Sequence, residues 1–197
     1  QKFIEENNTA QDFPFIIQKT PSTYSTSDAG NGVGYTGIRI RGSDATRINV
    51  TINGIPYNDS ESHGVFWVNM PDLASSSSSI QVQRGVGSST NGGGAFGGTV
   101  SIKTGNLSEK FRVNYSSSAG SFKTFKNSIE INSGLINSKL NFNLRLSKIT
   151  SDGYIDRASS DLKSYYASAS YYLKNTSVDF INFSGKDQLF KTHQFDQ

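Results

Sequence analysis

The sequence predicts a small α+β unit followed by a run of longer antiparallel strands. Two patterns carry this prediction: short apolar alternations between glycine turns from Gly37 to Thr104, and longer alternating segments from Phe111 onward. The composition agrees, because hydrophobic residues make up only 34% of the 197 residues while aromatic residues reach 12%. Large rings interleaved with polar residues do not suit a large dry helical core.

The composition also excludes several classes of protein. No stretch approaches 18 consecutive apolar residues, so any membrane role must be carried by strands rather than by a helix. The chain has no Cys, which excludes disulfides, thiolate zinc sites and a Cys nucleophile. Its net charge of +3 is too small and too scattered to indicate a nucleic-acid partner. The start at Gln1 shows no targeting segment, so we expect a processed or partial chain.

The first segment, up to about residue 34, contains one expected helix. Asp12 is a suitable N-cap, Pro14 fits a first helical turn, and the helix should end before Pro21. A run rich in Ser, Thr and Gly follows. Each strand of the next segment should bury one face, because apolar residues occupy every second position in 38–40, 48–52, 80–82 and 100–102.

From Phe111 the alternating segments lengthen to about ten residues. In one of them the apolar side carries Leu140, Phe142, Leu144 and Leu146, and the polar side carries Asn141, Asn143, Arg145 and Ser147. Residues 165–174 repeat the arrangement. Such segments, with Tyr at their ends, are typical of outer-membrane β-barrel strands. A soluble β-sandwich alternates in the same way, so both interpretations stay open at this point.

No residue set indicates catalysis. The glycine-rich run 84–99 lacks the Lys and the following helix that a phosphate-binding loop needs, and no Gly-x-Ser-x-Gly elbow is present. Asp59, Glu61 and His63 alternate and could share one side of an extended segment, but a solvated loop is the preferred interpretation over a metal site. Trp67 follows this loop, and core packing is favoured over ligand stacking.

Four motifs in one order resemble the plug domain of TonB-dependent outer-membrane receptors. They are Ile-Arg-Ile-Arg-Gly at 38–42, Asn-Val-Thr-Ile-Asn-Gly-Ile-Pro-Tyr at 49–57, Ile-Gln-Val-Gln-Arg-Gly at 80–85, and Gly-Gly-Thr-Val-Ser-Ile-Lys-Thr at 97–104. The runs 34–49 and 61–67 most resemble a Bacteroidetes-type subgroup. The resemblance implies a globular plug inside a barrel of about 22 strands.

This resemblance divides the chain into a plug at residues 1–106 and the first strands of a transmembrane β-barrel at 107–197. The second part supplies about five strands at roughly ten residues per crossing. Five strands cannot close a barrel, and an open edge in lipid would leave backbone groups unpaired. We therefore expect a fragment of a larger plugged barrel, with the energy-coupling segment upstream of residue 1.

The resemblance implies active import, with no enzymatic activity and no cofactor. The expected ligand is a siderophore-iron complex or other metal chelate, haem or cobalamin, and the plug should gate the barrel lumen. The expected partners are a TonB-type energising complex of the inner membrane, the ligand, outer-membrane lipid and a surface lipoprotein, but no nucleic acid. The expected location is the outer membrane of a Gram-negative bacterium. A complex-bound receptor that does not transport, a glycan importer and a soluble carbohydrate-binding module remain alternatives.

Two sets of site residues follow from the resemblance. Arg41 and Arg84 match the arginines that hold the plug to carboxylates of the barrel wall, and Glu130 is the nearby candidate carboxylate. Replacing either arginine by Ala should then cost about 3–5 kcal/mol of plug docking, whereas an exposed arginine would be worth under about 1 kcal/mol. Apical loops at 58–69 and 88–96 should contact the ligand through Asp59, Glu61, His63, Trp67 and Asn91.

Overall fold

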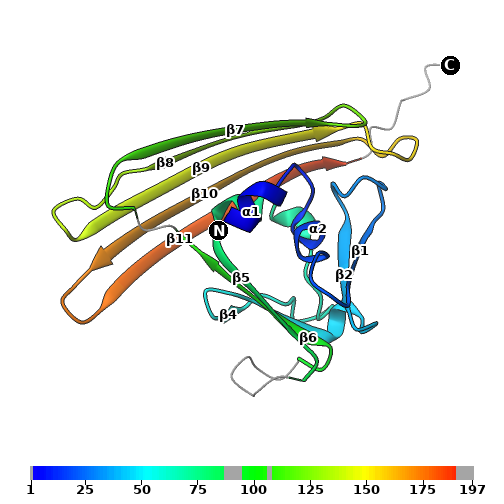
Figure 1. Cartoon of the computed structure of the whole chain (residues 1–197), viewed down its shortest axis with the longest axis horizontal. Helices are drawn as coiled ribbons and strands as arrows, with labels where there is room; N and C mark the ends of the chain where they lie inside the picture. The colour runs from blue at the N-terminus through cyan, green and yellow to red at the C-terminus, as the bar shows by residue number, and fades with distance from the viewer. Residues whose placement is uncertain (1, 87–94, 106–107, 190–197) are drawn as a thin grey trace.

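The computed structural model describes residues 2–86, 95–105 and 108–189, and these residues form two parts (Figure 1). The part up to residue 105 is a mixed α+β body, which we call the plug. The part from residue 108 is a sheet of long strands that lies against one side of this body (Figure 1). None of the helices in the described residues has the length and apolar content needed to cross a membrane.

The first part begins with two short helices and a two-stranded sheet. Helix α1 spans Lys2–Asn7 and helix α2 spans Phe13–Ile17, and the antiparallel strands are β1 (Thr23–Ser27) and β2 (Thr36–Ile40). Helix α2 begins after Asp12 and carries a proline in its first turn, as predicted. Helix α1 and strand β1 were not predicted, because α1 is only 6 residues long and Ser25 is the only fully buried residue of β1.

A second sheet forms the centre of the plug. Its elements in chain order are η1 (Ala45–Arg47), β3 (Ile48–Ile52), β4 (Ile55–Pro56), η2 (Trp67–Asn69), η3 (Leu73–Ser76), β5 (Ser77–Arg84) and β6 (Gly98–Thr104). The strand order is β4-β3-β6-β5, and only the β3–β6 pair is parallel. All five residues of β3 are buried, so the expected exposed face is absent in this inner strand.

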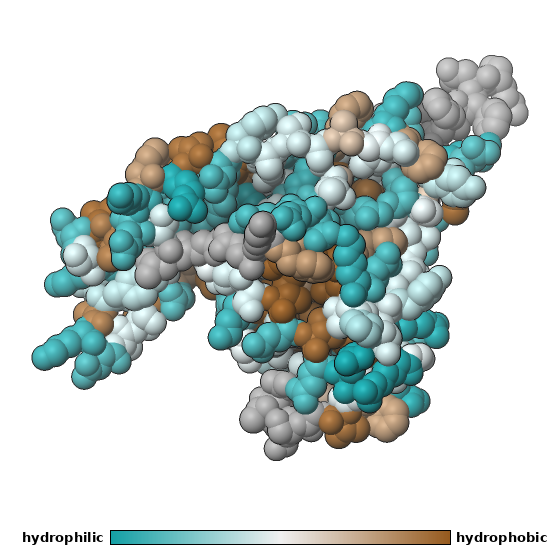
Figure 2. Space-filling view, in the orientation of Figure 1, coloured by the Kyte–Doolittle hydropathy of each residue, from teal (hydrophilic) through white to brown (hydrophobic). Residues whose placement is uncertain are grey.

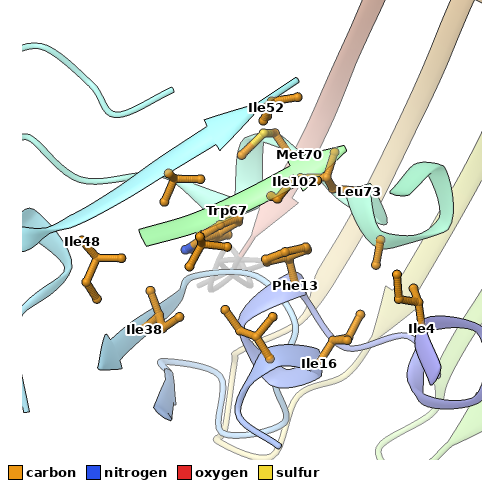
Figure 3. Close-up of a cluster of buried hydrophobic side chains, with 14 of the residues drawn as sticks. Ile4, Phe13, Ile16, Ile38, Ile48, Ile52, Trp67, Met70, Leu73 and Ile102 are labelled. Atoms are coloured by element: carbon orange, nitrogen blue, oxygen red, sulfur yellow. The ribbon is translucent and has the colours of Figure 1, made fainter. Parts of the chain in front are cut away.

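The plug core forms between this sheet and the short helices. Figure 3 shows Phe13 from α2 beside Trp67 from η2, with Ile16 of the same helix in the same cluster. The rings of Phe13 and Trp67 are stacked, with their centroids 4.8 Å apart. Stacked aromatic rings add to the free energy of area burial, so this contact helps to fix α2 against the sheet.

The second part is an open sheet of five antiparallel strands, which we call the wall. Its strands are β7 (Arg112–Gly120), β8 (Thr124–Asn132), β9 (Leu140–Ser151), β10 (Ser160–Tyr172) and β11 (Ser177–Leu189). They are hydrogen-bonded in chain order, which leaves β7 and β11 as the two edges. An unclosed sheet of this kind is what a fragment of a larger barrel presents.

The wall buries its polar face and exposes its apolar face. On β9 the side chains of Phe142 and Leu146 are 46% and 50% exposed, while Asn143 and Arg145 between them are buried. Figure 2 shows hydrophobic residues on the outer surface of the wall. A soluble sandwich would bury the apolar face, so this orientation favours the barrel interpretation over the sandwich.

Candidate functional site: the contact between plug and wall

A single carboxylate at the centre of the plug–wall contact holds two cations of the wall. Asp72 follows Pro71, has a left-handed backbone (φ 58°), and is the N-cap residue that immediately precedes η3. Lys126 Nζ lies 2.5 Å from one oxygen of Asp72, and Arg145 Nη1 lies 2.8 Å from the other. The three side chains are 0%, 2% and 3% exposed, in the order Asp72, Lys126, Arg145.

Hydroxyl groups complete the coordination of this carboxylate. The Ser147 hydroxyl donates to one Asp72 oxygen at 2.7 Å, and the Ser75 hydroxyl donates to the other at 2.6 Å. Arg145 Nε also donates to the Ser76 hydroxyl at 2.7 Å. We call Asp72, Ser75, Lys126, Arg145 and Ser147 the ion cluster. Its polar atoms are paired with one another, which is the condition under which buried charges are tolerated.

The charges of the wall decide the ionisation of Asp72. Burial alone would raise the pKa of its carboxyl group, but the charges of Lys126 and Arg145, with the hydrogen bonds from Lys126 and Ser75, outweigh burial and lower the pKa to about 2. Asp72 is therefore ionised at neutral pH, and the plug presents a fixed negative charge to a positively charged patch of the wall.

Further contacts surround the ion cluster. Tyr166 donates to the Thr104 hydroxyl at 3.0 Å, and Ser164 donates to the Pro71 carbonyl at 2.8 Å. At the other end of the wall, Asn31 donates to the Ser151 hydroxyl at 2.6 Å. A small apolar cluster joins the two parts through Ala10, Val33, Val68, Ile149 and Leu162. The plug is thus docked by polar and apolar contacts along the wall.

A cavity of about 950 Å³ lies beside the ion cluster. It is lined by residues of α1, by η3 and β5 of the plug, and by β7, β8 and β9 of the wall. Lys126, Arg145 and Ser75 line it as well, so the ion cluster borders this space directly. Glu130 also faces it, and its carboxylate accepts a hydrogen bond of 2.8 Å from Asn143.

A second buried carboxylate lies in the plug. Asp12 accepts a hydrogen bond from Thr36 at 3.0 Å through one oxygen, and its other oxygen has no hydrogen-bond partner. Burial raises the pKa of Asp12 to about 7, against the lowering effect of the hydrogen bonds from Thr36 and Gly34. Asp12 is the N-cap residue of α2, as predicted, and its side chain makes no cap hydrogen bond.

The predicted anchoring residues are not brought together in the described residues. Arg84 donates to the Pro21 carbonyl at 3.3 Å, and the Arg41 guanidinium lies beside Gly85. Among the ion pairs of the described residues, neither arginine pairs with Glu130. The described plug–wall ion pairs have the opposite polarity, with the carboxylate on the plug and the cations on the wall. The anchoring role of the two arginines stays a prediction.

The predicted ligand loop is a compact turn. The Asp59 carboxylate accepts hydrogen bonds from the backbone N–H groups of Glu61 and Ser62, and these bonds lower its pKa. Glu61 and His63 are exposed. No group of three His, Asp or Glu side chains that could hold a metal occurs in the part of the chain that the structure describes.

Two further residues of the ligand prediction have different outcomes. Trp67 is 2% exposed and stacks on Phe13 in the core, which is the alternative that the sequence favoured. Its ring is therefore not available to a ligand in this conformation. Asn91 lies outside the described residues, and so does the predicted boundary at residues 106 and 107. The ligand contacts of Asp59, Glu61 and His63 stay predictions.

Sequence reasoning missed the ion cluster. The sequence predicts Arg145 on the polar side of its strand, and Lys126 lies on the buried side of β8, four residues before Glu130, the residue that pairs with Arg145 in the sheet. Cations on the inward side of a barrel strand are a usable signal, because a buried cation needs a partner. Asp72 had no such signal, since it lies in a short irregular segment between η2 and η3.

These features define a plug domain docked on a β-wall, and the comparisons name the family. The model of the TonB-dependent receptor plug domain matches residues 1–99. The chain belongs to this family. A comparison with curated proteins finds no match.

Solved structures of the same fold come from several bacteria. The chain is similar to the siderophore receptor PirA from Acinetobacter baumannii, at 18% identity and a TM-score of 0.72, over 95% of this chain and 31% of that one. It is similar to the ferripyoverdine receptor of the outer membrane of Pseudomonas aeruginosa, at 14% identity and a TM-score of 0.71, over 89% of this chain and 23% of that one. It is also similar to the FrpB iron transporter from Neisseria meningitidis, at 16% identity and a TM-score of 0.75, over 95% of this chain and 31% of that one. The chain thus spans under a third of the length of each of these receptors.

Proposed function

We propose that this chain is the plug and the first wall strands of a receptor that imports a scarce ligand across the outer membrane in a TonB-dependent manner. The observation that carries this proposal is a plug docked on the polar face of a wall whose other face is apolar. Such a wall suits lipid on its outer side and a plugged lumen on its inner side. No residue set in the described chain points to catalysis on the ligand.

For the ligand we propose a siderophore-iron complex or another metal chelate, with haem and cobalamin as the next choices. This choice is supported by three similar structures that are named for a siderophore, for ferripyoverdine and for iron. The proposed partner is a TonB-type complex of the inner membrane. The location and the partner follow from membership of the family, and the Bacteroidetes-type subgroup remains a prediction.

Uptake in the native bacterium tests this function. We expect a strain that lacks the gene to lose accumulation of ⁵⁵Fe supplied as a hydroxamate or catecholate siderophore complex, and a protonophore to abolish accumulation in the parent strain. Labelled haem and cobalamin serve as the second and third probes. Surface binding without accumulation would indicate a receptor that does not transport. Unchanged accumulation of all the probes in the deletion strain would overturn the proposal.

A further inference from the structure

Three lysines lie side by side on the outer face of the wall. Lys148 of β9 pairs with Lys163 of β10, and Lys163 pairs with Lys186 of β11. These strands are neighbours in the sheet (Figure 1), so the three residues form one row across it, which we call the lysine row. All three side chains are exposed. They share the outer face with Leu146, because residues two apart in a strand point to the same side.

The lysine row carries a surplus of positive charge. Like charges directly opposite each other in a sheet repel, and neighbouring strands are only about 5 Å apart. Lys148 Nζ lies 3.6 Å from an oxygen of Asp161. The ion pairs of the described residues give the lysine row no other carboxylate partner. Asp187 follows Lys186 in β11 but points to the opposite face of the sheet. An anion from outside the chain would offset this repulsion.

The lysine row borders the apolar band of the wall. The residues of β9 that precede Lys148 on its outer side are all apolar, namely Leu140, Phe142, Leu144 and Leu146. The row between the lysines and this band contains Tyr165, which pairs with Leu146 and donates a hydrogen bond of 2.7 Å to Asn182. Tyrosines mark the edge of the apolar band in outer-membrane barrels. The lysine row therefore lies at the depth of the lipid headgroups, just outside the hydrocarbon.

We propose that the lysine row binds the headgroup of a membrane lipid that carries more than one phosphate. Lysine suits this role, because its flexible stem can lie along apolar surface while its ammonium group pairs with a phosphate. Basic clusters beside an apolar membrane segment attract anionic lipids in this way. A second phosphate is needed because one phosphate cannot lie beside both ends of a row that spans two strand spacings, about 10 Å. This inference rests on the proposed function only in placing the wall in the outer membrane.

The main test compares two triple variants of the complete native protein in nonionic detergent. The row variant carries Lys148→Gln, Lys163→Gln and Lys186→Gln. The control variant replaces three exposed lysines at the opposite end of the wall, by Lys110→Gln, Lys139→Gln and Lys174→Gln. Both variants lose three positive charges, so they differ in the place of the loss.

The readout is a titration with diphosphoryl lipid A, in which native mass spectrometry counts the lipid that each protein retains. We expect the affinity of the row variant to fall about a hundredfold, because each lysine near an anionic headgroup adds to the attraction. The affinity of the control variant should change little. Equal affinities of the two variants would show a response to net charge alone and would overturn the proposal.

Two further probes separate a lipid site from a general anion site. Monophosphoryl lipid A should bind the wild-type protein more weakly than diphosphoryl lipid A does, and equal binding would refute the need for more than one phosphate. Soluble pyrophosphate at the same concentration should not displace the bound lipid, because it has no acyl chains to lie on the apolar band. Displacement by pyrophosphate would overturn the lipid site.

A measurement on the wild-type protein keeps the proposal testable if the row variant does not fold. Bound diphosphoryl lipid A should slow the acylation of Lys148, Lys163 and Lys186 by an amine-reactive reagent. Lys139 and Lys174 are the internal reference, and their rates should not change. Equal rates of acylation of the lysine row with and without the lipid would contradict the proposal.

These readouts need neither an imported ligand nor an energy source, so they separate the two proposals. Absence of lipid binding at the lysine row with intact ⁵⁵Fe accumulation would refute the lipid site alone. Binding that depends on the lysine row, in a protein that accumulates none of the import probes, would refute the import proposal and leave the lipid site standing.

Discussion

The negative charge of Asp72 balances one buried cation on β8 and one on β9. Replacing it by Asn leaves Lys126 and Arg145 buried without their counter-ion, and we expect a loss of about 3–5 kcal/mol in plug docking. The control is Asp152→Asn, which breaks an exposed pair with Lys123 at 2.9 Å and should have a much smaller effect, because solvent screens this pair. Hydrogen exchange of the plug core measures both. Similar losses in the two variants would show that the ion cluster does not hold the plug.

The same carboxylate predicts a response to acid. The pKa of Asp72 is about 2 in the folded protein, against an ordinary value of 3.8. The stabilisation that the ionised carboxylate supplies is therefore complete above pH 3.8 and is lost as the pH falls toward 2. Exchange of the η3 amides should therefore accelerate across this window. In Asp72→Asn the contribution of this group to the acceleration should be absent.

Asp12 predicts the opposite dependence on pH. Its pKa is about 7 in the folded protein against an ordinary value of 3.8, so folding favours the protonated form and plug stability falls as the pH rises from about 4 to about 7. Asp12→Asn should be more stable than the wild type at pH 8 by on the order of 3 kcal/mol, and the difference should shrink toward pH 4. Asp28→Asn, on the exposed β1–β2 loop, is the control. Denaturant titrations at pH 4 and pH 8 measure the free energy of unfolding of the plug in the wild type and in both variants.

At the level of elements, a wall glycine allows the plug to approach β11. A Cβ at Gly185 would lie 2.5 Å from Pro71 Cδ and 2.8 Å from the Asn69 carbonyl oxygen. Gly185→Ala should therefore push η2 away from the wall and cost about 1–3 kcal/mol of plug docking. Gly120→Ala is the matched control on β7, because its Cβ would meet nothing closer than 3.8 Å. Equal rates of hydrogen exchange in the plug core of both variants would argue against a close approach of the plug to β11.

How well each element could be predicted depended on its periodicity. The strands of the wall and the strands 48–52 and 98–104 were predictable because their apolar residues alternate over several positions. Helix α1 and strand β1 lack such a pattern, and tertiary contacts hold them instead. Ile4 binds α1 into the plug core, and β1 pairs with β2.

For the whole molecule, the outward apolar face of the wall predicts contact with lipid. Leu146→Lys on β9 should cost about 2–4 kcal/mol if this face lies near the middle of a bilayer, and less near its surfaces. Ile55→Lys places the same charge on an exposed position of the plug and should be tolerated. The yield of heat-modifiable, folded protein in outer-membrane fractions measures the effect. Equal yields of the two variants would speak against a lipid-facing wall.

The alternating patterns and the order of the motifs were sufficient to predict a plug followed by wall strands, because local periodicity and turn chemistry are written in neighbouring residues. They could not say which face of the wall is buried, since a sandwich and a barrel share the same alternation. The tertiary structure decided this by placing the plug on the polar face. It also decided the site: Asp72 is far in the chain from Lys126 and Arg145, and only folding brings the charges of these two residues within 3 Å of its carboxylate. Contacts of that kind depend on the packing of whole elements, which no local pattern encodes.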